Sequence, residues 1–299
     1  MTPGEDAKLN EANTLVSVYI PTKNRCALLR RAVDSVLAQT HRNIELIVVS
    51  DGSDDGTVAY LESLRGEIPV RMLHNPVSVG ACAARNQALA IANGHFVTGL
   101  DDDDYFMPHR IESFLSAWKR HQRDGVEFSC LYDTSVINDG AKIEALTRRA
   151  RTTPQDILST NWIGNQMFTT RERLQAAGLY DPAMPAWQDW DLWARLLGKF
   201  GPAININSCS YFMDLSHEFE RISLRAPEKI KQAAALFYAK YCSRRDLPGL
   251  LMALESYPQI TLTLNDLCRI FPANPRLAVR KLVRRKFAAS LASSIARPA

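Results

Sequence analysis

Strand and helix signals alternate through the first hundred residues, and this alternation constrains the fold more than any other feature. Four short segments are predicted to be strands: Leu15–Ile20, an apolar run rich in β-branched residues, the apolar run Ile44–Val49, and the segments Val70–Leu73 and Phe96–Leu100. Between them, residues 28–37, 57–64 and 81–92 have the spacing or composition of helices. Strands that alternate with helices at this pace predict an α/β fold with a mostly parallel, doubly wound sheet.

In such a sheet, ligands bind beyond the carboxyl ends of the strands. The residues that follow three of the predicted strands are Pro21–Asn24, Asp51–Ser53 and Asp101–Asp104, and all three groups are polar. We therefore expect the functional site at this edge of the sheet.

The pattern loosens beyond Pro108. A helix is predicted over Arg110–His121, strand-like segments over 128–136 and 162–169, and a helix from about Asp189. After Ser223 the chain reads as helical, with prolines as breakers. We expect a short disordered lead-in over 1–13, one α/β domain over 14–222 and a mainly helical region with a basic tail over 223–299.

The charge is divided unevenly along the chain. Residues 269–299 hold eight Lys or Arg and no acid, which leaves 36 − 8 = 28 basic against 32 acidic residues in the remainder. The mildly acidic body argues against nucleic acid as a partner, whereas the tail suits an anionic membrane surface or is simply a solvated helix.

Several observations favour a cytoplasmic location. No apolar run reaches the roughly 20 residues of a membrane-spanning helix, and the polar N-terminus lacks a signal-peptide layout. The six cysteines show no C-x-x-C spacing, which argues against a zinc site or a disulfide framework.

Asp101-Asp102-Asp103-Asp104 is the most informative segment. Four adjacent carboxylates repel one another, and a fold tolerates them mainly where cations or other partners neutralise them. Carboxylate oxygens favour Mg²⁺ or Mn²⁺, which commonly binds one or two carboxylates together with substrate phosphates. A solvated acidic turn that caps the next helix is the alternative.

Other candidates are individually weaker. Asp51 sits in an ordinary Asp-Gly turn yet also at a strand end, and Arg85 could reach a diphosphate or a base edge, or lie on the surface. Asp189 is either a helix N-cap or a carboxylate whose aromatic neighbours raise its pKa toward that of a general base. On a helix, Asp189 and Asp191 point about 200° apart, so both cannot face one pocket. A lone histidine such as His217 is more often structural than a ligand.

Together these segments resemble the glycosyltransferase family 2 enzymes, which have the GT-A fold. The matching segments are VSVYIPTKNR ending at Arg25, IELIVVSDGSDDGT (44–57), NPVSVGACAARNQAL (75–89), HFVTGLDDDDYFMPHRI (95–111) and PAWQDWDLWARL (185–196). The resemblance extends from about Leu15 to His217.

The resemblance implies a role for each matching residue. It places Pro21, Thr22 and Asn24 at the nucleotide, Asp51 at the N3–H of a uracil-like base, and Arg85 at the base or diphosphate. Asp101 or Asp102 would lie near the ribose, Asp103 would hold Mn²⁺ or Mg²⁺, and His217 would lie at the diphosphate and metal. Asp189 would be the catalytic base. These assignments are those of the aligned positions: Pro21, Thr22, Asn24, Asp51, Arg85, Asp101, Asp102, Asp103, Asp189 and His217.

The implied reaction is a single displacement with inversion, from a nucleotide-sugar donor to a hydroxyl of a glycan or lipid-linked acceptor. Residues 14–110 would form the nucleotide-sugar half and 111–222 the acceptor half. The chain departs from the family pattern at Gln188, where an acidic residue is usual, and at Leu215, where an arginine is common. The basic tail fits an enzyme that works at a membrane face.

Two other readings remain open. A nucleotidyltransferase also joins an α/β sheet to metal-binding carboxylates, but it would normally have a Gly-rich loop where this chain has Pro21–Arg25. A catalytically inactive nucleotide-binding or scaffold protein of the same fold would bind a donor without turning it over.

Overall fold

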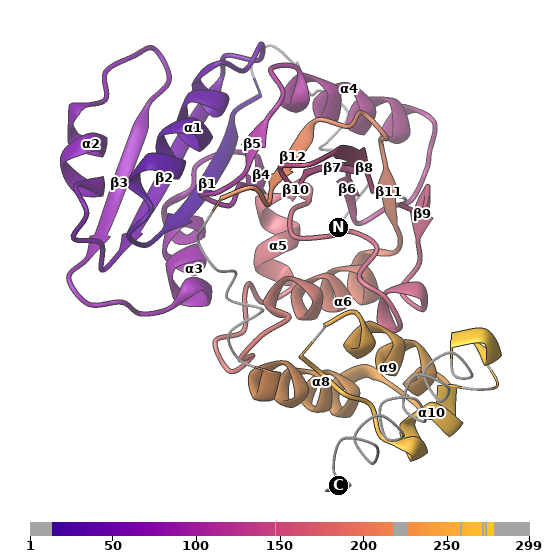
Figure 1. Cartoon of the computed structure of the whole chain (residues 1–299). Coiled ribbons are helices and arrows are strands. Elements are labelled where there is room, and N and C mark those ends of the chain that lie inside the picture. The colour runs from indigo at the N-terminus through magenta and orange to yellow at the C-terminus, as the bar shows by residue number, and fades with distance from the viewer. Residues whose placement is uncertain are drawn as a thin grey trace, which may run out of the picture. The chain divides into compact units, whose positions relative to one another are not determined.

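The computed structural model of the 299-residue chain describes residues 14–146, 148–217, 227–257, 259–270, 272 and 274–277 (Figure 1). The chain divides into two compact units. The first holds most of the chain up to residue 219, and the second holds residues 220–299 with two short earlier segments, 158–161 and 184–187. The predicted lead-in over 1–13 and most of the basic tail, 278–299, lie outside the described residues.

The N-terminal part of the first unit is the predicted parallel sheet. Its strands are β1 (Val16–Thr22), β2 (Ile44–Asp51), β3 (Val70–Asn75) and β4 (Phe96–Gly99). They lie in the order β3-β2-β1-β4, and all neighbouring pairs are parallel. The connecting helices are α1 (Cys26–Leu37), α2 (Thr57–Ser63) and α3 (Ala81–Ile91). The apolar runs form strands here because β1 and β2 are buried almost throughout.

Beyond β4 the same sheet continues with shorter strands. They are β10 (Phe168–Thr170), β6 (Cys130–Tyr132), β11 (Ala203–Asn205) and β9 (Arg151–Thr152), in that order from β4. Strand β10 runs antiparallel to both β4 and β6. The expected α/β class with a mostly parallel sheet is thus confirmed, with an antiparallel insertion at β10.

A second sheet has the order β5-β12-β7-β8. Its strands are β5 (Tyr105–Phe106), β12 (Tyr211–Asp214), β7 (Ser135–Asn138) and β8 (Ile143–Ala145). The single strand predicted over 128–136 was wrong, because β6 and β7 belong to different sheets and are separated by Asp133 and Thr134. Asp133 interrupts the run because its buried carboxylate forms an ion pair with Arg110 and accepts hydrogen bonds from the 208–210 segment. The strand predicted over 162–169 was also largely wrong, since β10 begins only at Phe168.

Helix α4 (Arg110–Arg123) packs on the middle of the large sheet through aromatic side chains. Phe96 of β4 stacks on Phe168 of β10 at 4.8 Å and meets Trp118 of α4 edge-on at 4.9 Å. This core fixes β4 and β10 side by side. The position of β4 matters because the four aspartates follow it directly.

The remaining helices of the first unit are α5 (Arg171–Ala176) and α6 (Gln188–Phe200), and a 3₁₀ turn, η3, spans Asp156–Leu158. The second unit is helical in its described part, as expected: α8 (Pro227–Tyr241), α9 (Leu247–Glu255) and α10 (Leu264–Ile270). A small core of Leu251, Leu262, Leu267 and Ile270 joins α9 to α10. Among the described residues, no helix has both the length and the apolar character needed to cross a bilayer.

Candidate active site

The carboxyl ends of β1 and β4 meet at one edge of the sheet, because the two strands are parallel neighbours. Thr22 is the last residue of β1, and its hydroxyl donates a hydrogen bond of 2.7 Å to Asp102, two residues beyond Leu100. The aspartate cluster therefore lies where the strand-end rule predicted.

The four aspartates have different partners. Asp101 accepts hydrogen bonds from Arg85 at 3.2 Å, from Gln166 at 3.1 Å and from Asn165 at 2.7 Å. It thereby connects α3, which carries Arg85, with the segment that leads into β10. Asp101 is thus held in place by both halves of the first unit.

Asp102 and Asp103 share one cation. The Nη1 atom of Arg25 lies 3.1 Å from Asp102 Oδ1 and 3.0 Å from Asp103 Oδ2. Asp102 is 6% exposed, and this burial, together with the charge of Asp103, raises its pKa to about 6 even though Arg25 and the Thr22 hydroxyl act in the opposite direction. Because the ionised form of Asp102 is unfavourable beside Asp103, a further cation at this position would stabilise it.

Asp104 differs from the other three, because it faces the protein interior. It is buried and accepts hydrogen bonds from the Tyr211 hydroxyl at 2.7 Å and from the Asp214 backbone N–H at 3.1 Å. Burial, together with Asp101 and Asp103, raises its pKa well above the ordinary value. Asp104 therefore serves to fasten β12 to the cluster.

His217 lies beside Asp103. Its Nε2 atom is 3.4 Å from Asp103 Oδ2, and its side chain is only 9% exposed. The contact is supported by Arg31 of α1, which donates a hydrogen bond of 2.6 Å to the backbone carbonyl of Asp103 and forms an ion pair with Asp214. The prediction that His217 and Asp103 lie together is consistent with this geometry.

The residues present fit a divalent cation that is completed by a substrate. In the part of the chain that the structure describes, no three His, Cys, Asp or Glu side chains form a metal-holding group. Asp103 and His217 nevertheless offer one carboxylate and one imidazole, and the guanidinium of Arg25 supplies beside that carboxylate the positive charge that a metal ion would replace. Mg²⁺ and Mn²⁺ often take only one or two protein carboxylates and draw their other ligands from phosphates and water.

Asp189 is the second residue of α6, so it lies inside the first helical turn instead of at the N-cap. Burial raises its pKa, while the backbone N–H of Trp190 and the charge of Arg85 act to lower it, and Asp101 acts to raise it. The charges of Arg85 and Asp101 thus influence the pKa of Asp189 in opposite directions. Gln188, which stands where the family has an acid, accepts a hydrogen bond of 3.4 Å from Arg85.

Asp191 points elsewhere, as the helical geometry predicted. It is fully buried and forms an ion pair of 2.8 Å with Arg195, one turn further along α6. Arg195 in turn donates to the backbone carbonyl of Leu179 at 2.6 Å. Asp191 is thus a structural residue, which leaves Asp189 as the carboxylate of this helix that interacts with the cluster.

Asp51 has a full set of hydrogen-bond donors around it. Its carboxylate accepts from Asn75 at 3.0 Å, from Ser78 at 2.6 Å and from the backbone N–H groups of Val79 at 2.8 Å and Gly80 at 2.9 Å. Although burial acts to raise its pKa, these hydrogen bonds lower it below the ordinary value. Asp51 fastens the loop at the start of α3, and a contact between Asp51 and a base stays a prediction.

Asn24 connects two of the strand-end loops. Its backbone is in the left-handed region (φ 52°), its N–H donates to Ser53 at 3.1 Å and its side-chain oxygen accepts from the Asp54 N–H at 2.8 Å. Asn24 therefore holds the loop after β1 against the loop after β2. Pro21, the next-to-last residue of β1, is partly exposed, and its predicted contact with a nucleotide, like that of Asn24, stays a prediction.

Several residues of the site were not predicted. Arg25 follows the polar segment Pro21–Asn24 by one residue, so a slightly wider strand-end window would have included it. Asn165, Gln166 and Tyr211 gave no sequence signal, because a long connection and a second sheet bring them to the cluster. Gln166 also packs on Gly99, where an added Cβ would lie 2.1 Å from the Gln166 side-chain oxygen.

Comparisons with known proteins agree with this architecture. The family model for glycosyl transferase family 2 matches residues 17–182, which is more than half of the chain. The chain is 31% identical over 241 residues to a protein named as a colanic acid biosynthesis glycosyl transferase, WcaA of Escherichia coli strain K12, and the match covers 78% of this chain and 84% of that one.

Solved structures share the fold at lower identity. The S. aureus protein TarS, residues 1–349 in complex with UDP-GlcNAc, superposes with a TM-score of 0.60 at 16% identity, over 80% of this chain and 71% of that one. The mannosyltransferase PcManGT of Pyrobaculum calidifontis, in complex with GDP-Man and Mn²⁺, gives a TM-score of 0.54 at 18% identity, over 90% and 82% of the two chains. These structural neighbours are GT-A glycosyltransferases. The chain belongs to glycosyl transferase family 2 and has the GT-A fold.

Proposed function

We propose that this protein is a metal-dependent, inverting glycosyltransferase that transfers a sugar from a nucleotide-diphosphate donor, UDP-linked, to a hydroxyl of a glycan or lipid-linked acceptor. We further propose that it acts in the synthesis of a cell-surface polysaccharide or lipopolysaccharide. The resemblance to WcaA supports the pathway class, and the UDP-GlcNAc bound by TarS supports the donor class.

The observation that carries the proposal is the arrangement of charge around the aspartate cluster. Asp102 and Asp103 share Arg25, and Arg85 pairs with Asp101 and also donates a hydrogen bond to Gln188, the residue before Asp189. Arg25 thus joins Asp102 to Asp103, and a second arginine, Arg85, joins Asp101 to the start of the helix that carries the candidate base. A donor would occupy the strand ends, with Pro21, Thr22 and Asn24 toward the nucleotide.

In this proposal Arg85 and Asp101 orient the donor, and Asp51 supports the base-binding loop through its contacts with Ser78 and Gly80. Asp102, with its raised pKa, lies toward the ribose. Asp103 and His217 are the residues that would hold Mn²⁺ or Mg²⁺. Such a cation supplies positive charge that offsets the charge developing on the leaving diphosphate.

Asp189 is proposed to be the base. A general base works best when its pKa lies near the working pH, and burial moves the pKa of Asp189 upward in that direction. In its ionised form the carboxylate accepts the proton of the acceptor hydroxyl as that oxygen bonds to the anomeric carbon and the bond to the diphosphate breaks. The acceptor is then proposed to be bound by residues of the 125–220 region.

An inactive scaffold of the same fold is the second candidate, favoured by Gln188, which replaces one acidic residue of the family pattern. A scaffold would bind a nucleotide sugar without transfer or hydrolysis. Peripheral attachment to the inner face of the cell membrane through 269–299 stays a prediction, because most of this tail lies outside the described residues.

A panel of nucleotide sugars tests the proposal. Thermal unfolding is measured with each donor, with and without Mn²⁺, and released nucleotide diphosphate is assayed for every donor that stabilises the protein. We expect one UDP-sugar to raise the melting temperature only with Mn²⁺ and to be hydrolysed slowly in the absence of acceptor. Stabilisation without any release of UDP, even with a mixed glycan acceptor pool, would favour the scaffold.

A further inference from the structure

The helical second unit contains a pocket that is separate in sequence from all the site residues described above. Its volume is about 750 Å³, within the range of small-molecule sites. Eleven residues line it, and they come from α8, from α9 with the turn before it, and from α10: Lys231, Ala234, Ala235, Tyr238, Arg244, Leu247, Pro248, Leu250, Leu251, Leu254 and Arg269.

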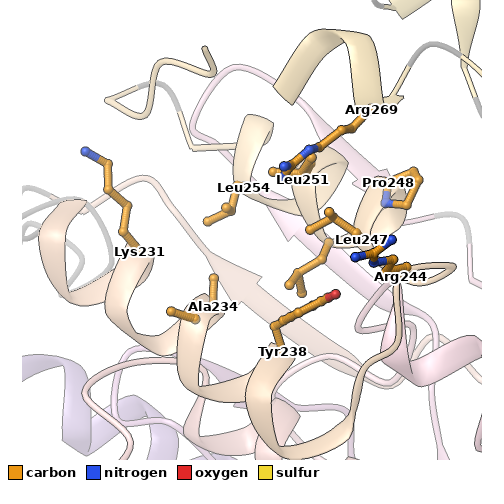
Figure 2. A pocket seen from close by; sticks show the side chains of 11 residues that line it. Lys231, Ala234, Tyr238, Arg244, Leu247, Pro248, Leu251, Leu254 and Arg269 are labelled. Carbon is orange, nitrogen blue, oxygen red and sulfur yellow. The ribbon is translucent and has the colours of Figure 1, made fainter. Parts of the chain in front are cut away.

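The pocket is apolar because two helix faces meet there. On α8 the lining residues Lys231, Ala234, Ala235 and Tyr238 recur at helical spacing and form one face. On α9 four leucines do the same, at positions 247, 250, 251 and 254. Figure 2 shows Leu247, Leu251 and Leu254 opposite Ala234 and Tyr238. A hydrocarbon chain placed between the two faces would be shielded from water by both of them.

The charged residues of the lining are all basic. Lys231, Arg244 and Arg269 come from three different elements and lie around the leucines, and none of the eleven lining residues is acidic (Figure 2). Lys231 forms an exposed ion pair with Glu228 at 3.0 Å. Arg244 and Arg269 are both exposed. The pocket therefore combines an apolar floor with two exposed arginine side chains.

This chemistry selects an anionic amphiphile. A neutral lipid would leave the two arginines unused, and a hydrophilic anion would leave the partly exposed Leu247 and Leu254 uncovered. A group with several negative oxygens can be contacted by cations from more than one element, which a singly charged carboxylate cannot do as well.

We infer that this pocket binds a lipid phosphate, a single hydrocarbon chain with a phosphate or diphosphate at one end, as the carrier part of the acceptor. The inference rests on the proposed function for the acceptor role, whereas the binding itself can be tested separately. The hydrocarbon lies along the leucines of α9, and the phosphate contacts Arg244 and Arg269.

The test is calorimetric titration of the full-length protein with farnesyl phosphate below its micelle concentration, and with farnesol and inorganic phosphate as matched ligands. We expect farnesyl phosphate to bind at least tenfold more tightly than either. The double variant Arg244→Gln/Arg269→Gln should lower that affinity at least tenfold, and Ala235→Glu, which adds an acid at an exposed lining position, should do the same. Arg245→Gln is the control, because Arg245 is an exposed neighbour of Arg244 outside the pocket lining.

Three results would overturn the inference. They are no binding of farnesyl phosphate, an equal loss of affinity for it in Arg245→Gln and in the pocket variants, and tighter binding to phosphatidylglycerol vesicles than to farnesyl phosphate. Stabilisation by donor and Mn²⁺ is recorded for the same variants. If it persists while lipid binding fails, only the pocket inference is wrong. If the donor response is absent in the wild-type protein, the proposed function itself fails.

Discussion

Replacing Asp102 with asparagine should stabilise the ligand-free protein at neutral pH while weakening donor binding. Asparagine has the same shape as aspartate and keeps a carbonyl oxygen for Arg25, and the Thr22 hydroxyl can rotate to accept from the new amide. What the substitution removes is the negative charge. That charge is unfavourable in the folded protein, because Asp102 is nearly buried beside Asp103.

The magnitude follows from the pKa. The folded-state pKa of Asp102 is about 6 and its ordinary value is 3.8. Between about pH 4 and pH 6 the folded protein therefore binds more protons than the unfolded chain, so the free energy of unfolding falls as the pH rises. At about 1.4 kcal/mol per pKa unit the loss reaches ~2–3 kcal/mol above pH 6, which corresponds to ~4–10 °C in melting temperature.

The assay compares the melting temperatures of Asp102→Asn and the wild-type protein from about pH 3 to pH 8 in chelator-containing buffer. The two should agree below about pH 4, diverge between about pH 4 and pH 6 and differ by a constant amount above that, with the variant the more stable. Asp124→Asn, at an exposed helix end, is the control and should show no such divergence. A variant that is less stable at pH 8, or a difference that does not change with pH, would refute the electrostatic argument.

Three further substitutions probe other parts of the site. Asp189→Asn should keep the stabilisation by donor and Mn²⁺ but lower kcat for transfer by roughly 10²–10⁴-fold, since general-base contributions have this size; normal turnover would remove Asp189 from the base role. Arg25→Gln should raise the affinity of the donor-free protein for Mn²⁺ by about tenfold in a calorimetric titration. The reason is that Arg25 lies within 3.1 Å of both Asp102 and Asp103 and competes with the metal. Weaker Mn²⁺ binding by the variant would contradict this competition. Gly99→Ala should lower the free energy of unfolding in urea by about 1–3 kcal/mol. The added Cβ would come within 2.8 Å of the Tyr19 ring and closer still to Gln166. An unchanged midpoint of urea unfolding would show that the Tyr19 and Gln166 side chains move aside without cost.

The parallel half of the fold was predictable because each of its strands and helices carries a local signal. The runs at 44–49 and 96–100 are apolar and bounded by polar turns, and β2 and β4 begin at their first residues. The later strands were not predictable in the same way. β6 and β7 lie close in sequence yet join different sheets, and what separates them is the pairing of Asp133 with Arg110, a contact that no periodicity reveals.

The candidate site was predictable to a similar extent. Asp101–Asp103 could be located because strand ends of a parallel sheet meet at one edge, and the opposite directions of Asp189 and Asp191 follow from helical geometry. The different environments of the four aspartates could not be read from the sequence. Asp104 is turned inward by Tyr211, a residue more than a hundred positions away.

The role of Asp103 as metal ligand predicts that a cation bound there couples to a nucleotide diphosphate. UDP is titrated into the wild-type protein, Asp103→Asn and the control Asp124→Asn, each with and without Mn²⁺. We expect Mn²⁺ to tighten UDP binding at least about tenfold in the wild-type protein and in the control, and this gain to be lost in Asp103→Asn. An equal gain in Asp103→Asn would contradict the claim that this carboxylate holds the metal.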